Sequence, residues 1–164
     1  MRPSRLRKRK SSRPTTRDSS VNSRTVEGKL LNSFAERLRQ QDGLRDLDIV
    51  KNPANESKMS EVLREFMFPH MCFVQDAPSF KRLVSTATLA WNAALLPADE
   101  RSAMLEELSQ DFDSKTREDF CEAMGELIER KLHHFAQYRR TIVDVQVTDT
   151  EGGYHLAVAT LLKP

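Results

Sequence analysis

The spacing of apolar residues predicts a series of amphipathic helices followed by two strands. Apolar side chains recur every three or four residues, as on one face of a helix, in five segments. We expect these helices at about residues 26–41, 56–68, 78–95, 97–109 and 114–137. The period then changes to two, which predicts strands at about residues 141–149 and 154–162, with a Glu-Gly-Gly turn between them. The fold class is therefore α+β and mostly α, ending in an antiparallel β-hairpin.

Each predicted helix carries an apolar stripe that we expect to face the core. In the first two helices the stripes comprise Val26, Leu30, Leu31, Phe34 and Leu38, and then Met59, Val62, Leu63 and Phe66. The widest stripe belongs to the third helix, which we expect to be central, and comprises Phe80, Leu83, Val84, Ala87, Ala90, Trp91, Ala94 and Leu95. The last two stripes comprise Ala103, Met104, Leu105 and Leu108, and then Phe120, Met124, Leu127, Ile128, Leu132 and Phe135.

Capping residues and prolines set the expected helix ends. Asn55 or Ser57 is a good N-cap for the second helix, and Pro69 is expected to close it. Pro78 and Pro97 are expected at the first positions of the third and fourth helices, where proline is favoured.

The charge of the chain changes sign near residue 29. Residues 1–29 hold ten Lys or Arg against two acids, a net of about +8, whereas residues 30–164 hold sixteen against twenty-two, a net of about −6. Residues 1–25 also have almost no large apolar side chain, so we interpret them as a disordered basic arm. Residues 26–164 are expected to form a single domain.

The arm contains a compact cationic block that suits phosphate binding. Its charged residues are Arg5, Arg7, Lys8, Arg9 and Lys10. Such blocks bind nucleic acid weakly and without sequence preference, or act as nuclear localisation signals. No aromatic residue is interleaved with these charges to stack on bases, and the body is net acidic. A solubilising tail, or coding-like residues added by an upstream start codon, is an equally weighted interpretation.

The fifth predicted helix has an acidic face that resembles a metal site. Glu118, Glu122, Glu126, Glu129 and His133 lie at helical spacings that could chelate a cation. However, these acids alternate with Arg117, Arg130 and Lys131, and a Glu-x-x-His pair is lacking because Leu132 follows Glu129 by three. We therefore expect a solvated, ion-paired face, and we assign no catalytic, cofactor-binding or metal-binding residue.

The thiols and imidazoles do not assemble into a catalytic motif in the sequence. His70 and Cys72 are close, but nothing in the sequence supplies a group to orient a base or an oxyanion loop. Cys72 lies in an apolar run, so we expect it to be a buried structural thiol, and Cys72 and Cys121 fit a reducing cytoplasm. We expect His155 to point outward from its strand. Lys131, Arg139 and Arg140 suggest a small anion site, although stabilising the helix C-terminus explains them more simply.

From residue 58 onward the sequence resembles a family of small uncharacterised bacterial domains. The similar stretches are residues 58–63, residues 89–92 and 95–97, residues 128–131, residues 143–149 and residues 153–159. In that family the domain sometimes accompanies a cysteine-rich SEC-C metal-binding tail, and this chain has no such tail. The resemblance implies a helical bacterial domain in the cytoplasm without an established activity, and it transfers no functional residue.

Three functional hypotheses follow from the sequence. The first is a non-enzymatic protein-interaction module without a cofactor, which self-associates through the hairpin edge or the apolar third helix. The second is sequence-independent nucleic-acid binding through the arm. The third is a small metal-dependent hydrolase that uses the acidic face of the fifth helix. No segment is apolar enough to span a bilayer, so we expect no membrane contact and a cytoplasmic location.

Overall fold

The computed structural model describes residue 40, residues 57–151 and residues 153–161. The chain divides into two compact units, residues 1–45 and residues 46–164, and the fold below is that of the second. The predicted basic arm, the predicted helix at 26–41 with its apolar stripe, and the candidate cap Asn55 lie outside the described residues.

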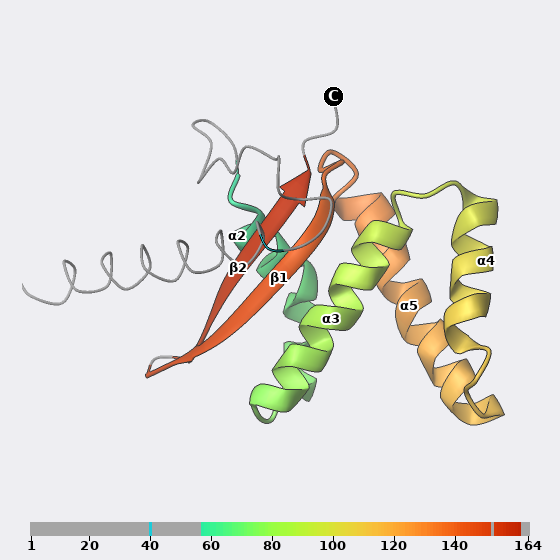
Figure 1. Cartoon of the computed structure of the whole chain (residues 1–164), viewed down its shortest axis with the longest axis horizontal. Coiled ribbons are helices and arrows are strands. Elements are labelled where there is room, and N and C mark those ends of the chain that lie inside the picture. The colour runs from blue at the N-terminus through green and yellow to red at the C-terminus, as the bar shows by residue number, and fades with distance from the viewer. Residues whose placement is uncertain (1–39, 41–56, 152, 162–164) are drawn as a thin grey trace, which may run out of the picture. The chain divides into compact units, whose positions relative to one another are not determined.

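Four α-helices, one 3-10 helix and a C-terminal hairpin make up the described part of the second unit (Figure 1). The elements are α2 (Met59–Met67), η1 (Phe68–Phe73), α3 (Ala77–Ala93), α4 (Ala98–Ser109), α5 (Ser114–His134), β1 (Thr141–Thr150) and β2 (Gly153–Leu161). The prediction of a mostly helical α+β fold that ends in an antiparallel hairpin is confirmed.

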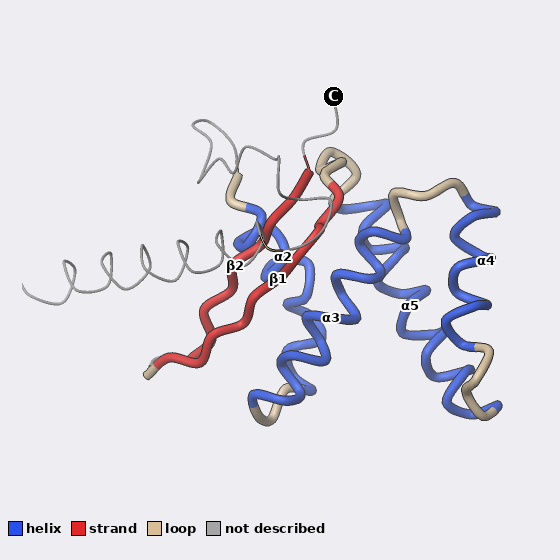
Figure 2. Tube along the Cα trace, viewed as in Figure 1, coloured by secondary structure: helices blue, strands red, loops and turns tan. Residues whose placement is uncertain are grey.

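Helix α3 is the centre of the core, as its wide apolar stripe predicts. It packs against α2, α5 and β1, and Figure 2 shows it between the red hairpin and the helices α5 and α4. Trp91 is fully buried there, and its indole Nε1 donates a hydrogen bond of 2.9 Å to the Arg140 carbonyl. The Phe66 ring meets Trp91 edge to face, with ring centroids 5.4 Å apart.

The starts of α2, α3 and α4 differ from prediction, since α3 begins at Ala77, one residue before Pro78, and α4 begins at Ala98, one residue after Pro97. Lys58, not Ser57, precedes α2, and its side chain makes no capping bond. Helix α2 ends at Met67, just before Pro69, as predicted, and Pro69 itself lies in the first turn of η1, where a missing backbone N–H costs nothing. Asp76 caps α3 through a reciprocal pair of bonds: its carboxylate accepts from the Ser79 N–H at 2.7 Å, and its own N–H donates to the Ser79 hydroxyl at 3.0 Å.

The expected inward face of α4 is wrong for two of its four residues, whereas Met104 and Leu105 pack against the core. Ala103 and Leu108 are exposed, and Met104 and Leu105 are only half-buried. The physical reason is position, because α4 stands at the edge of the unit and packs mainly on α5 (Figure 1). Leu132 on α5 is likewise exposed rather than inward. The stripes of α2 and α3, by contrast, are buried or half-buried throughout.

Cationic side chains cover the C-terminus of each described helix. No glycine follows any of the four helices to terminate it, so the last carbonyls need other donors. Arg130 donates to the Phe66 carbonyl at the end of α2, Arg101 to that of Ala93 at the end of α3, and Arg117 to that of Ser109 at the end of α4. Lys131 donates to the Phe135 carbonyl just after α5. These cations also oppose the negative end of each helix dipole.

The hairpin lies on the helices and is fastened to them at both strands. Tyr154 stacks on Phe80 of α3 with ring centroids 4.5 Å apart, and the Arg64 guanidinium of α2 donates to the Tyr154 carbonyl. The Asn92 side chain of α3 bonds both backbone groups of Ile142, accepting from its N–H at 2.9 Å and donating to its carbonyl at 2.7 Å. Asn92 therefore occupies the place of a neighbouring strand at the start of β1.

The outer edge of β1 is interrupted a second time, just after Ile142. The strand register shifts between Ile142 and Asp144, as at a β-bulge, and the Asp144 carboxylate accepts from the Val145 N–H at 2.7 Å. Bulges and satisfied backbone groups make an edge a poor template for another strand. His155 is half-buried, and its ring Nδ1 is enclosed without a hydrogen-bond partner in the structure.

Candidate functional site

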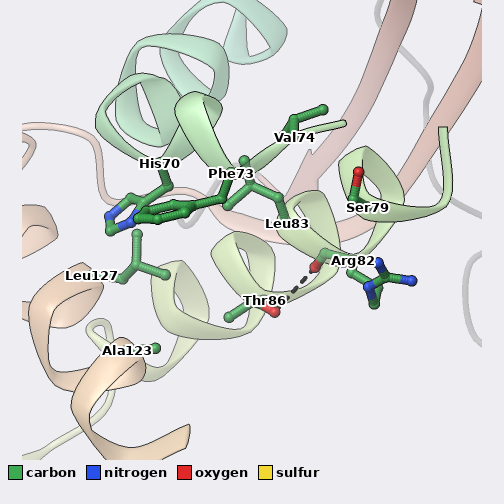
Figure 3. Close-up of a pocket in the computed structure, with 9 residues that line it drawn as sticks. All are labelled: His70, Phe73, Val74, Ser79, Arg82, Leu83, Thr86, Ala123 and Leu127. Atoms are coloured by element: carbon green, nitrogen blue, oxygen red, sulfur yellow. Dashed lines mark hydrogen bonds between the residues drawn. The ribbon is translucent and has the colours of Figure 1, made fainter. Parts of the chain in front are cut away.

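A shallow apolar hollow lies where η1, α3 and α5 meet (Figure 3). It encloses about 170 Å³. Nine residues line it: His70, Phe73 and Val74 from η1 and the residue after it, Ser79, Arg82, Leu83 and Thr86 from α3, and Ala123 and Leu127 from α5. We call this feature the η1 groove.

The short 3-10 helix leaves an aromatic side chain at the rim of the groove. Phe73 is 74% exposed, and in Figure 3 its ring lies beside the His70 imidazole, between the α3 and α5 sides of the groove. Phe68 at the other end of η1 is 73% exposed. A six-residue helix containing a proline has too little surface to bury every apolar side chain it carries, so both ends of η1 present an aromatic ring to solvent.

Both hydroxyl groups that line the groove are already engaged in the fold. The Ser79 hydroxyl accepts the Asp76 N–H, and the Thr86 hydroxyl donates to the Arg82 carbonyl at 3.0 Å. Hydrogen bonds donated to the Asp76 carboxylate by the Ser79 hydroxyl and the Ser79 N–H lower the pKa of this carboxyl, with a smaller contribution from the Arg82 charge. Figure 3 shows the Arg82 guanidinium extending away from the hollow. What faces the hollow is therefore mainly hydrocarbon, which suits the burial of an apolar group.

The size of the hollow limits what it can take. Pockets for drug-sized ligands measure roughly 300–1,000 Å³, and a cavity of roughly 150 Å³ holds a molecule of the size of benzene. At about 170 Å³ the η1 groove accommodates one aromatic or branched aliphatic side chain. Such a hollow next to an exposed ring is the usual form of an anchor position in a protein interface.

Cys72 is exposed, so the prediction of a buried thiol is wrong. Its Sγ donates to the Pro69 carbonyl at 3.5 Å, and it lies next to Phe73 on η1. The error arises because the apolar run around Cys72 forms a narrow 3-10 helix, and only some faces of this helix reach the core. Cys121 on α5 is exposed as well.

The acidic face of α5 differs from the ion-paired face that was predicted. Glu129 and His133 approach to 2.9 Å, but Arg117 and Arg130 reach backbone carbonyls of α4 and α2. Within residues 57–151 and 153–161, no three His, Cys, Asp or Glu side chains are grouped so that they could hold a metal ion. The expected salt bridges are replaced by helix capping, which the local sequence cannot indicate.

Lys131 is the most perturbed ionisable group in the described part of the chain. It is 2% exposed, its ammonium lies 4.4 Å from the centre of the Trp91 ring, and burial lowers its pKa to about 8, helped by the nearby Arg139 charge. Sequence reasoning placed Lys131 on the solvated face. Its spacing of four residues from both Leu127 and Phe135, which are buried, was a signal that it shares the inner stripe.

The cationic block of the arm cannot be placed on this site. Arg5, Arg7, Lys8, Arg9 and Lys10 lie outside the described residues. The η1 groove itself was not predicted, because its lining comes from three elements whose meeting depends on tertiary packing.

Comparisons with protein-family models, with curated proteins and with solved structures found no match to this chain. The resemblance to a bacterial domain family therefore stays a prediction. In residues 57–151 and 153–161, no helix has the length and apolar character needed to cross a membrane.

Proposed function

We propose that the second unit is a non-enzymatic protein-interaction module whose docking surface is the η1 groove. The observation that carries this proposal is Phe73, which is 74% exposed at the rim of an apolar hollow sized for one side chain. Burying an exposed phenylalanine in an interface releases apolar surface from water and contributes roughly 1.5–3 kcal/mol. The Ser79 and Thr86 hydroxyls of the groove are bonded within the fold, so docking would not leave these two groups unpaired.

The third helix is not the docking element in this proposal. Its apolar residues Val84, Ala87, Ala90 and Trp91 are buried against neighbouring elements. The edge of β1 is a poor alternative, since Asn92 and the Asp144 carboxylate bond its backbone at two positions. The proposal thus keeps the interaction hypothesis drawn from the sequence and moves its surface to η1.

Site-specific photo-crosslinking tests this proposal in the cells that make the protein. A photoreactive phenylalanine analogue replaces Phe73 in one sample and Leu108, an exposed residue of α4, in a control sample. We expect a discrete protein adduct from position 73 and none of the same mass from position 108. Equal adducts from both positions, or none from position 73, would contradict the docking surface.

A substitution that fills the hollow tests whether the hollow takes part in docking, and the same substitution on α4 serves as its control. Ala123→Leu adds a side chain into the hollow, whereas Ala103→Leu adds the same atoms on the exposed face of α4. The crosslink from position 73 should fall about tenfold with Ala123→Leu and remain with Ala103→Leu. Identical yields in the two backgrounds would mean that the hollow takes no part in docking.

The charge of the arm favours a second function, weak nucleic-acid binding. Ten Lys or Arg against two acids in residues 1–29 would bind phosphate through counterion release. Deletion of residues 1–25 should abolish binding to a duplex of random sequence, and binding by the full chain should fall steeply between 50 and about 200 mM salt. Binding that survives the deletion would remove this function. We do not propose a metal-dependent hydrolase.

A further inference from the structure

The imidazole of His70 is the polar group through which the η1 groove can recognise an occupant. The polar side chains that line the groove are His70, Ser79, Arg82 and Thr86. The Ser79 and Thr86 hydroxyls are bonded within the fold, and the Arg82 guanidinium extends away from the hollow (Figure 3). In the part of the chain that the structure describes, His70 forms no hydrogen bond or ion pair, so its ring nitrogens are available to an occupant.

Docking in the groove would separate the His70 imidazole from water. His70 is half-buried, and Figure 3 shows its ring beside the Phe73 ring. A half-buried imidazole can still bond to water, which an occupant that fills the hollow displaces. A neutral imidazole has one N–H donor and one acceptor nitrogen, and a bond lost on docking weakens binding unless the occupant replaces it. A purely hydrocarbon anchor therefore matches the walls of the groove but not His70.

We infer that the η1 groove takes a tyrosine side chain of the protein partner. This inference rests on the proposed function and names the anchor that the partner presents. A phenol ring is close to benzene in size, and a hollow of about 170 Å³ accommodates it. The phenol hydroxyl can both donate and accept a hydrogen bond, so it can pair with His70 in either tautomer of the imidazole.

The rest of the lining favours an aromatic anchor over a smaller or a charged one. Leu83, Ala123 and Leu127 supply aliphatic walls, and the exposed Phe73 ring can pack against a second ring edge to face or offset. A serine or threonine would reach His70 only by leaving most of the hollow empty. A charged anchor would lose its water against walls that are mainly hydrocarbon. Tyrosine is also enriched at the buried centres of protein interfaces.

Two small probes that differ by one hydroxyl test this anchor in the full chain. Toluene represents a phenylalanine side chain, and p-cresol represents a tyrosine side chain. Chemical-shift changes of the Leu83 and Leu127 methyl groups in NMR titrations give the dissociation constant of each probe, for the wild type and for His70→Leu. We expect the preference for p-cresol over toluene to fall about tenfold in His70→Leu, because the buried hydroxyl then lacks its partner.

Two further variants make the readout specific to the His70 hydrogen bond. His134→Leu removes an exposed imidazole at the end of α5, outside the groove, and should leave the preference unchanged. His70→Gln keeps both a donor and an acceptor and should retain most of the preference. The same ratio of dissociation constants in the wild type and in His70→Leu would overturn the tyrosine inference.

The outcome of this test is separable from that of the docking surface. Toluene binding reports on the hollow itself, and the adduct from position 73 reports on docking of a protein. If only the tyrosine inference is wrong, toluene still binds and the adduct still forms, but His70→Leu does not change the ratio of the two probes. If neither probe binds to the wild type, the hollow is not an anchor site, and the inference fails with it.

Discussion

At the scale of single residues, Lys131 is the clearest case of a side chain whose environment opposes its charge. It lies against Trp91 in the core, and its ammonium is held by one carbonyl, that of Phe135. Burying a lysine disfavours the charged form, which is why its pKa is lowered to about 8. The cation–π contact and the bond to Phe135 offset part of this cost and keep the side chain in place.

The titration of Lys131 should be visible in the stability of the fold. Its pKa is about 8 in the folded chain and about 10.5 in the unfolded chain. Between these pH values the unfolded chain binds more protons, so the free energy of unfolding should rise with pH, by about 3 kcal/mol at most. Lys131→Met removes this contribution. Urea unfolding measures the free energy of unfolding at pH 7.5 and at pH 10. This free energy should increase more for the wild type than for the variant, and equal increases would contradict the lowered pKa of Lys131.

A second residue-scale prediction concerns Asn92, which replaces a strand neighbour for Ile142. Asn92→Ala removes two hydrogen bonds and leaves the N–H and carbonyl of a buried residue without them. We expect a loss of about 2 kcal/mol in the free energy of unfolding. Gln110→Ala, at an exposed position after α4, is the matched amide control and should cost under about 0.5 kcal/mol. Similar losses for the two variants would show that the bonds to Ile142 contribute little.

At the scale of elements, the molecule ends its helices with side-chain cations rather than with glycine. Three arginines and Lys131 each reach the last carbonyls of one helix, and three of the four come from α5. Helix α5 thus contacts other helices through hydrogen bonds from its basic side chains as well as through its apolar stripe. This explains why basic residues interrupt the acids of α5 without pairing with them.

Removing one of these caps should destabilise the whole unit. Arg101→Met deletes bonds to the Ala93 and Leu96 carbonyls at the end of α3, and should lower the free energy of unfolding by roughly 1–2 kcal/mol. Lys81→Met, on the exposed surface of the same helix, should change it by less than about 0.5 kcal/mol. Chemical denaturation of both variants gives the comparison, and an equal effect would mean that the cap is not stabilising.

The elements also show which structural features local sequence can predict. Period and β-branched content place both strands within about a residue or two of β1 and β2, and the buried stripes of α2 and α3 follow from helical spacing. The buried face of α4 could not be predicted from helical spacing, because its burial depends on how extensively α4 packs against α5. The 3-10 helix was missed since six residues around Pro69 carry no periodic signal. The η1 groove exists only after three elements pack.

At the scale of the whole molecule, the charge break near residue 29 and the η1 groove concern different parts of the chain. The positive charge lies in residues 1–29 of the first unit, which are outside the described residues, and its expected ligand is a polyanion. The groove lies on the second unit, and its expected ligand is an apolar side chain of a protein partner. The two proposed functions are therefore separable by truncation of the arm and by substitution in the groove.

The central claim is that the η1 groove is where this protein docks a protein partner. Photo-crosslinking from position 73 in the cells that make the protein tests it most directly, in the otherwise wild-type chain and in the Ala123→Leu and Ala103→Leu backgrounds. The account predicts a discrete protein adduct in the otherwise wild-type chain and with Ala103→Leu, and about tenfold less of it with Ala123→Leu. The same adduct yield in all three proteins would contradict it.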